Sequence, residues 1–158
     1  MSKIYKDKSG INGTGLYTNV ALNSGDFVAY IHGPMIIVRE WTKTLSRKSL
    51  NWIGAGKYSW IDTKQSPFRY INHSCTPNVA IVTKRKVVAI THIPANTEIT
   101  MDYSLSESDE GWSIDCDCKN KNCRKEIRSI QSLDRKTFNK SKEYIATAFK
   151  KIYQQANS

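Results

Sequence analysis

Short apolar and β-branched runs, separated by glycine and polar breaks, occupy most of the first 103 residues. Residues 20–38 alternate apolar runs with turn signals at 24–26 and 32–34, which predicts a hairpin. We expect a glycine-tipped hairpin with aromatic strands over 52–61, a second hairpin over 79–93 and one more strand over 98–103. The pattern therefore predicts a mainly β fold with short helices.

Helical spacing appears at 39–50 and in the tail. The first segment places Trp41, Leu45 and Lys48 on one side of a short helix. A helical turn is expected after Asp134, a good N-cap residue, and an amphipathic helix from about Ser141. Its apolar face consists of Ile145, Ala148, Phe149, Ile152 and Tyr153. One hypothesis is that this face, through Ile145, Phe149 and Ile152, binds a second copy or a partner.

The composition is that of an ordinary globular protein with one domain and an appendage. The 158 residues are 39% hydrophobic and 24% charged, and no run approaches the ~20 apolar residues of a membrane span. The first residues lack a signal-peptide pattern. We therefore expect an intracellular protein with no membrane partner; nucleus, cytoplasm and delivery as an effector all stay open.

The positive charge is concentrated at the C-terminal end. Residues 119–158 hold 11 Lys or Arg and 3 Asp or Glu, so they carry +8 of the net +10. Such a tail can contact nucleic acid, an acidic protein face or an anionic membrane. The alternative is a solvated helix surface.

The cysteines fall into two segments far apart in sequence. Cys116, Cys118 and Cys123 lie within eight residues, and Cys75 is the remaining thiol. Tetrahedral zinc takes four ligands, and reduced thiols inside a cell favour metal over disulfides. Two disulfides are the alternative, although Cys116 and Cys118 are too close to pair comfortably. The set therefore predicts one zinc ion that ties the middle of the chain to its C-terminal region.

Three further features are weak when taken singly. Residues 72–78 read Asn-His-Ser-Cys-Thr-Pro-Asn, which alone is typical of a structural polar turn. The triplet Gly13-Thr14-Gly15 permits close backbone approach to a ligand but is too short for a nucleotide fingerprint. Tyr103 ends a predicted strand, where a tyrosine is usually a core residue.

Together, these features resemble the SET-domain protein lysine methyltransferases that carry a post-SET zinc site. The resemblance covers roughly residues 4–127. Its motifs are Gly13-Thr14-Gly15-Leu16-Tyr17, Arg69-Tyr70-Ile71 followed by the 72–78 stretch, Ile93-Pro94-Ala95, Glu98 to Tyr103, and Cys-x-Cys-x4-Cys. It implies a SET β-fold with a threaded C-terminal segment over 1–104, a post-SET zinc segment over 105–127 and a basic helical tail over 128–158.

The resemblance also implies a reaction and its residues. S-adenosylmethionine would be the cofactor, Tyr103 the catalytic residue between the cofactor and lysine pockets, and the zinc would be structural. The cofactor-binding residues would be Gly13, Thr14, Gly15, Arg69, Asn72, His73 and Ile127. The metal ligands would be Cys75, Cys116, Cys118 and Cys123. Tyr58 and Trp60 are candidate channel or cofactor-pocket aromatics, although aromatics in a strand are more often core.

The chain also departs from the family pattern. Met101 replaces the usual Phe or Tyr two residues before the catalytic tyrosine, which leaves the number of methyl groups added open. Asn96-Thr97 replaces a Gly-Glu turn, which survives because Asn tolerates the left-handed conformation. Arg124-Lys125 replaces Arg-Gly after the last cysteine. This last replacement is expected to alter the post-SET loop.

The expected substrate is a basic protein, either a histone tail or a non-histone lysine. An acidic stretch could dock it, with a solvated loop as the alternative; its members are Glu107, Asp109, Glu110, Asp115 and Asp117. A second functional hypothesis is a catalytically inactive SET-like module that contacts nucleic acid or chromatin through 119–158.

Overall fold

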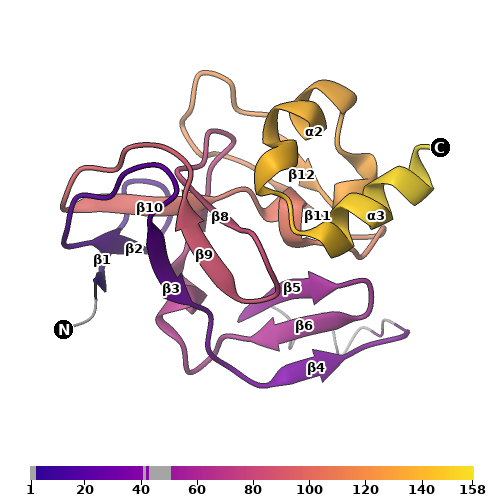
Figure 1. Ribbon diagram of the computed structural model, residues 1–158, viewed down its shortest axis with the longest axis horizontal. Helices are drawn as coiled ribbons and strands as arrows, with labels where there is room; N and C mark the ends of the chain where they lie inside the picture. The colour runs from indigo at the N-terminus through magenta and orange to yellow at the C-terminus, as the bar shows by residue number, and fades with distance from the viewer. Residues whose placement is uncertain (1–2, 41, 43–50) are drawn as a thin grey trace.

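Three small sheets and a two-stranded ribbon build the fold of residues 3–40, 42 and 51–158, the part described by this computed structural model (Figure 1). The first sheet has the order β1 (Ile4–Lys8), β2 (Thr14–Thr18), β10 (Thr97–Met101), β7 (Asn72–His73). The second is β3 (Phe27–Tyr30), β9 (Lys86–Ala89), β8 (Val79–Ile81), and the third is β4 (Met35–Ile37), β6 (Ser59–Asp62), β5 (Trp52–Gly56). The ribbon pairs β11 (Ser113–Asp115) with β12 (Glu126–Arg128).

Two of the three predicted hairpins are confirmed. β5 pairs antiparallel with β6, and β8 with β9, as the glycine tip and the polar interruption predicted. The hairpin predicted over 20–38 is wrong, because β3 pairs with β9 and β4 pairs with β6. The helix predicted over 39–50, with Trp41, Leu45 and Lys48, falls mainly outside the described residues.

Distant segments separate β3 from β4. The guanidinium of Arg85 donates to the carbonyls of Ile31 and Gly33, at 2.9 Å each. Gly33 has a φ of +144°, and a Cβ there would lie 1.9 Å from the carbonyl oxygen of Asp62. The turn is therefore pressed against the end of β6, so the two strands run into different sheets instead of folding back on each other.

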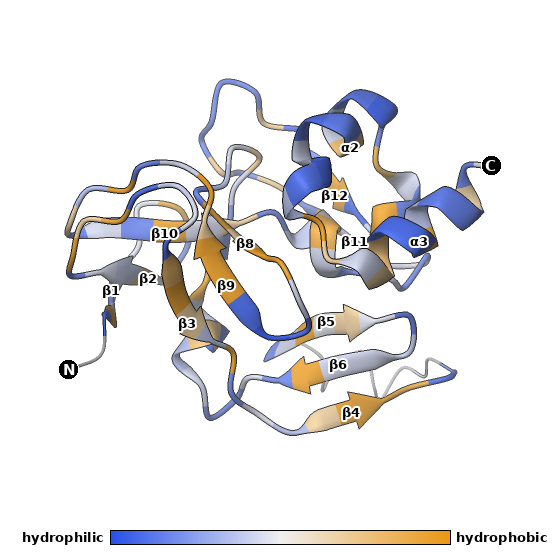
Figure 2. Ribbon diagram, viewed as in Figure 1, coloured by the Kyte–Doolittle hydropathy of each residue, from blue (hydrophilic) through white to orange (hydrophobic). Residues whose placement is uncertain are grey.

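The main hydrophobic core lies between the sheets. Its fully buried members include Leu16, Ile61, Val87 and Ile99, one or more from each sheet. In Figure 2 the paired strands β3 and β9 carry hydrophobic residues side by side, β9 toward its arrowhead end. Burial of the last residue of β10, Met101 at 3% exposure, brings the end of that strand into the interior.

A parallel pair joins the two functional motifs. β7 lies beside β10, with Asn72 opposite Thr100 and His73 opposite Met101. The 3₁₀ helix η2 (Pro67–Tyr70) leads into β7, and the 3₁₀ helix η3 (Tyr103–Ser106) follows β10. The pairing therefore places the 72–78 motif next to Tyr103.

The tail is helical, as predicted. It contains η4 (Ile130–Ser132), α2 (Arg135–Ser141), η5 (Lys142–Tyr144) and α3 (Thr147–Ala156). Asp134 caps α2 by accepting from the backbone N–H of Thr137 at 2.9 Å. The last helix starts later than Ser141 because η5 and an extended Ile145 come first. None of the helices in the described part has the length and hydropathy of a membrane span.

The tail packs onto the β body instead of standing apart. A second core joins it to Leu105 of η3, and its buried members are Ile130, Leu133, Phe138, Ile145, Ala146, Phe149, Ile152 and Tyr153. A Cβ on Gly54 of β5 would lie 1.8 Å from the carbonyl oxygen of Ser106 and 3.1 Å from the Phe149 ring. The hypothesis of an outward partner face is wrong, because Ile145, Phe149 and Ile152 are buried within the chain.

Candidate functional site

Tyr103 stands at the point where β10 gives way to η3. The preceding Asp102 caps η3 by accepting from the backbone N–H of Ser104 at 3.1 Å. The Tyr103 hydroxyl donates to the carbonyl of Ile71 at 2.6 Å. Burial, together with the negative charge of Glu98, raises the pKa of Tyr103 to about 12. The phenol therefore stays neutral, and remains a hydrogen-bond donor, throughout the physiological range.

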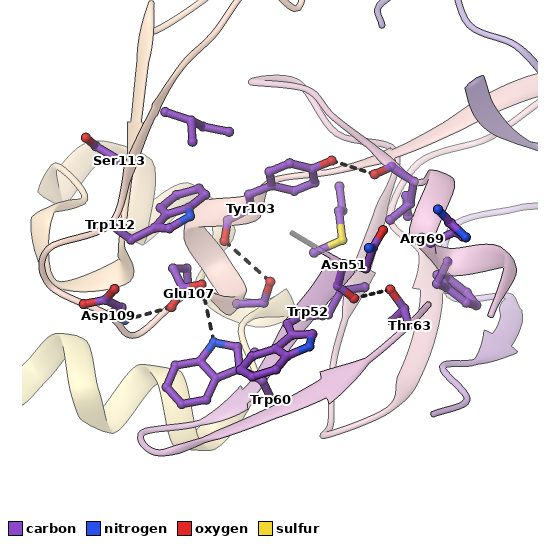
Figure 3. Close-up of a pocket in the computed structure, with 17 residues that line it drawn as sticks. Asn51, Trp52, Trp60, Thr63, Arg69, Tyr103, Glu107, Asp109, Trp112 and Ser113 are labelled. Carbon is purple, nitrogen blue, oxygen red and sulfur yellow. Dashed lines mark hydrogen bonds between the residues drawn. The ribbon is translucent and has the colours of Figure 1, made fainter. Parts of the chain in front are cut away.

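Tyr103 lines a cavity of about 370 Å³ (Figure 3). The cavity is walled by residues of β5, η2, η3 and the 107–114 loop. Its lining residues are Asn51, Trp52, Ile53, Gly54, Trp60, Thr63, Phe68, Arg69, Ile71, Met101, Tyr103, Ser106, Glu107, Asp109, Trp112, Ser113 and Ile114. A space of this size, with apolar walls and a few polar groups, is typical of a site for a small ligand or one long side chain.

Two of the three residues predicted for the substrate channel line this cavity. Met101 and Trp60 line it, although they are only 3% and 2% exposed. Tyr58 does not line it and is 47% exposed, which corrects the prediction for that residue. It lies in the turn between β5 and β6, before the alternation of β6 begins. Sequence reasoning missed Trp52 and Trp112, which no short motif marks.

Asn72 ties the glycine segment to β10. Its amide nitrogen lies 3.1 Å from the Asn12 carbonyl and 3.2 Å from the Thr14 carbonyl, on either side of Gly13. The same nitrogen lies 3.0 Å from the hydroxyl of Ser9 and 2.9 Å from the Glu98 carboxylate. Two amide hydrogens thus serve four acceptors, and Asn72 joins the 9–14 segment to Glu98 of β10.

The two glycines of the loop meet different surroundings. Gly13 has a φ of +53°, and a Cβ there would meet nothing within 4 Å. A Cβ on Gly15 would lie 2.4 Å from Oε1 of Glu98, the oxygen that Asn72 contacts. A side chain at position 15 would therefore displace the Glu98 carboxylate, whereas Gly13 leaves backbone open to a ligand. Glu98 and Ser9 were missed from sequence, because their role depends on contacts across the sheet.

The His73 ring is engaged inside the protein. Its Nδ1 accepts from the backbone N–H of Tyr103 at 3.2 Å, and its Nε2 lies 3.3 Å from Sγ of Cys75. Burial lowers the pKa of His73 to about 4, against the opposing charge of Asp102. The ring is therefore neutral, with the proton on Nε2 facing the sulfur. It links Tyr103 to the cysteine cluster.

The four cysteines come together as predicted. Their sulfur atoms all lie within 4.8 Å of one another, and those of Cys75 and Cys116 are 3.8 Å apart. All four are free thiols, so the disulfide alternative is not adopted. A tetrahedral ion with zinc–sulfur bonds of about 2.3 Å requires sulfurs about 3.8 Å apart. The donor set and its spacing therefore fit zinc, with no ligand position left for water.

The cysteine cluster adjoins Tyr103. Ile127 of β12, 1% exposed, packs among the cysteines, and Tyr103 and Trp112 pack against the same group. The Arg124 side chain, next to Cys123, donates to Asp102 at 2.5 Å. Sequence reasoning missed this ion pair. The cysteine cluster is thereby linked to Tyr103 through packing and through the Arg124–Asp102 ion pair.

The acidic stretch divides into two groups. Glu107 and Asp109 line the cavity, whereas Glu110, Asp115 and Asp117 are exposed. Burial raises the pKa of Glu107, against hydrogen bonds from the backbone N–H groups of Asp109 and Ser108. The stretch is therefore not one uniform surface.

Comparisons with known proteins agree with this geometry. The family model described as SET domain matches residues 13–104. Histone-lysine N-methyltransferase 2D of Homo sapiens is 31% identical over 140 residues, covering 78% of this chain and 2% of that protein. Histone-lysine N-methyltransferase trithorax of Drosophila virilis is 30% identical over 149 residues, covering 79% of this chain and 4% of that protein.

A solved structure gives the same fold. One chain of the crystal structure of an active polycomb repressive complex 2 in the basal state matches with a TM-score of 0.55 and 25% identity. The match covers 63% of this chain and 15% of that one. The chain thus spans only a small part of these relatives, and the likeness concerns the domain they share with it.

Proposed function

The chain belongs to the SET-domain family, and from that premise we propose that it transfers methyl groups from S-adenosylmethionine to the side-chain amine of a protein lysine. The observation that carries the proposal is the position of Tyr103. Its neutral hydroxyl lies beside the Ile71 carbonyl in the wall of a cavity that can hold one long side chain. The glycine loop, Asn72, Tyr103 and the cysteine cluster also follow one another along the chain in the order typical of the family.

The cavity would prepare the nucleophile. Free lysine has a pKa of about 10.4, yet only the neutral amine attacks. Apolar walls such as Trp60, Ile71 and Met101 disfavour the charged form and lower the pKa of a lysine that enters. Tyr103 and the Ile71 carbonyl would then orient the amine, since alignment supplies much of the rate of an in-line displacement.

The open backbone at Gly13 carries the proposed cofactor site. Bound S-adenosylmethionine would supply an electrophilic methyl group on a positively charged sulfur. Gly13, Thr14 and Gly15 would present backbone to it, with Arg69, Asn72 and His73 beside them and Ile127 as an apolar contact. Because both ring nitrogens of His73 are engaged internally, that residue would contribute its backbone.

Zinc would have a structural role here. Cys75, Cys116, Cys118 and Cys123 would fill all four positions, so no metal-bound water would be available for chemistry. The ion would fix the 116–127 segment against Ile127 and Tyr103.

The substrate we propose is a basic protein, a histone tail or another lysine-rich segment. The names of the relatives support the histone class, and the acidic groups Glu107 and Asp109 in the cavity wall favour a basic partner. Met101 lines the cavity, so the number of methyl groups added would depend on it. Nucleic-acid contact through 119–158 stays a prediction.

An assay with isotope-labelled S-adenosylmethionine tests the function. Purified protein is incubated with a histone panel and a cell lysate, and labelled products are identified by mass spectrometry. We expect label on lysine side chains for the wild type and none for Tyr103→Phe. Zero transfer by correctly folded, zinc-loaded wild type to every substrate would overturn the proposal.

A further inference from the structure

Glu107 lies in the cavity wall, and the two oxygens of its carboxylate have unequal hydrogen bonding (Figure 3). Its Oε1 accepts from the backbone N–H groups of Ser108 and Asp109, at 2.6 and 2.8 Å. Its Oε2 has only a long contact, 3.4 Å, with the indole nitrogen of Trp60. One oxygen is thus well satisfied, and the other keeps capacity for a stronger donor.

The backbone that carries the Glu107 side chain is anchored by hydrogen bonds. The Glu107 carbonyl accepts from the backbone N–H of Ile130 at 2.9 Å. The adjoining Ser108 donates its hydroxyl to the Gly56 carbonyl at 3.1 Å and accepts at its own carbonyl from Gln131 at 2.9 Å. Glu107 is therefore fixed between β5 and the start of the tail before any ligand arrives.

Glu107 forms no ion pair with another described residue. Among the described residues, no Lys or Arg nitrogen lies within 4 Å of the Glu107 carboxylate. A buried carboxylate without a counter-charge is costly, and an entering cation relieves that cost. Trp52 and Trp112 also line the cavity, and indole faces attract cations.

Tyr103 marks a different end of the cavity. In Figure 3 its hydroxyl points toward the Ile71 carbonyl and away from Glu107, which lies near Trp60 and Asp109. A lysine amine held at Tyr103 does not bring its own charge to Glu107. A positive group at Glu107 would therefore come from another part of the substrate.

We propose that Glu107, with the indoles around it, forms a subsite for a positively charged side chain close to the target lysine in the substrate, arginine above all. The inference rests on the proposed function. Guanidinium is favoured because it offers several donors in a plane and stacks on aromatic faces. The subsite selects lysines that have a basic neighbour.

Paired peptides test the subsite directly. Each peptide carries one lysine in a neutral background, with arginine at one flanking position or with citrulline, its uncharged isostere. The measurement is kcat/KM for labelled methyl transfer. At one or two positions the wild type is expected to prefer arginine by about 10- to 100-fold, the size of a charge-assisted hydrogen bond. Glu107→Gln should bring that ratio close to one.

Two further variants guard the result. Glu110→Gln removes an exposed carboxylate three residues away and should leave the arginine preference as in wild type. Glu107→Asp keeps the charge and should keep a ratio well above one. Circular dichroism establishes that each variant is folded. The arginine-to-citrulline ratio of the wild type tests the proposal even if a variant fails to fold.

The outcomes separate the two proposals. Methyl transfer by the wild type with no arginine preference at any position overturns the subsite and leaves the methyltransferase intact. A preference that survives in folded Glu107→Gln also overturns it. Absence of transfer to every peptide and every histone overturns the proposed function, and the subsite with it.

Discussion

The amide of Asn72 donates to the carboxylate of Glu98 at 2.9 Å, and the carboxylate held there occupies the space that a side chain at position 15 would need. A Cβ on Gly15 would lie 2.4 Å from the same carboxylate oxygen. Residues from three segments, 9–15, 72 and 98, thus form one unit. The glycine loop depends on a residue more than 80 positions away.

Gly15→Ala should therefore disable cofactor binding while the β core stays folded. The new methyl group displaces Glu98, and Asn72 then loses its hold on the loop. We expect at least a ~10-fold rise in the Kd for S-adenosylmethionine, measured by calorimetry, because a charged hydrogen bond is lost. The matched control is Gly10→Ala, where a Cβ meets nothing within 4 Å and the Kd should stay unchanged. Equal effects of the two variants would contradict this account.

Tyr103→Phe should abolish most methyl transfer and lower stability modestly. It removes the hydroxyl that donates to the Ile71 carbonyl, and losing such a bond costs about 1–3 kcal/mol. Labelled methyl transfer and urea unfolding measure the two effects. Tyr58→Phe is the control, because Tyr58 is outside the cavity and exposed. Full activity in Tyr103→Phe would contradict a catalytic role for the Tyr103 hydroxyl.

The ionisation of Tyr103 predicts a pH-dependent difference in stability. Its pKa is about 12 in the folded state against about 10 unfolded, so the folded state holds the proton more tightly. Below pH 10 the effect on the free energy of unfolding is constant. As pH rises from 10 toward 12, wild type loses stability relative to Tyr103→Phe, by about 1.4 kcal/mol at pH 11. Unfolding of both proteins at pH 8 and pH 11 checks this; a constant difference would refute the burial of the phenol.

Loss of zinc should stop methyl transfer without unfolding the sheets. Cys75→Ser removes one of four ligands and releases the 116–127 segment from Ile127 and Tyr103. Metal analysis is expected to find about one zinc per wild-type chain and less in the variant. Thr76→Ala, at the exposed neighbouring position, serves as the control. Full activity in a sample shown to be free of zinc would contradict the structural role.

Phe149→Ala should lower both the stability of the protein and its methyl transfer, although Phe149 does not line the cavity. The Phe149 ring, 2% exposed, packs near Gly54, which lines the cavity. Removing a buried phenylalanine costs about 3–5 kcal/mol. We expect that loss in urea unfolding, together with reduced methyl transfer. Lys151→Ala changes an exposed residue of the same helix and should do neither.

Local signals account for the parts that were predicted correctly. The glycines at 54 and 56, the polar break at 83–86 and the cap at Asp134 act within a few residues, and each produced the expected element. Asn96 adopts a φ of 60°, as the surviving turn required. The thiols were predicted together because metal chemistry needs four of them.

Long-range contacts explain the failures. β3 and β4 separate because Arg85 and Asp62 reach the turn between them, which no local pattern reveals. Glu98 and Glu107 look like ordinary acidic residues until the sheet and the tail surround them. The tail face was predicted to bind a partner because an amphipathic helix has the same apolar stripe whether it packs within its own chain or against another protein. Tyr58 and Trp60 are two positions apart, so the sequence pattern places both on the same face of one strand. In the structure β6 begins at Ser59, and only Trp60 belongs to it.

The contact of Phe149 with Gly54 also sets an order of events during synthesis. The glycine loop near residue 13 is synthesised more than 130 residues before the helix that supports the cavity. A growing chain that has not yet reached that helix lacks the support behind β5. We therefore expect methyl transfer to begin only after residues near 149 have emerged.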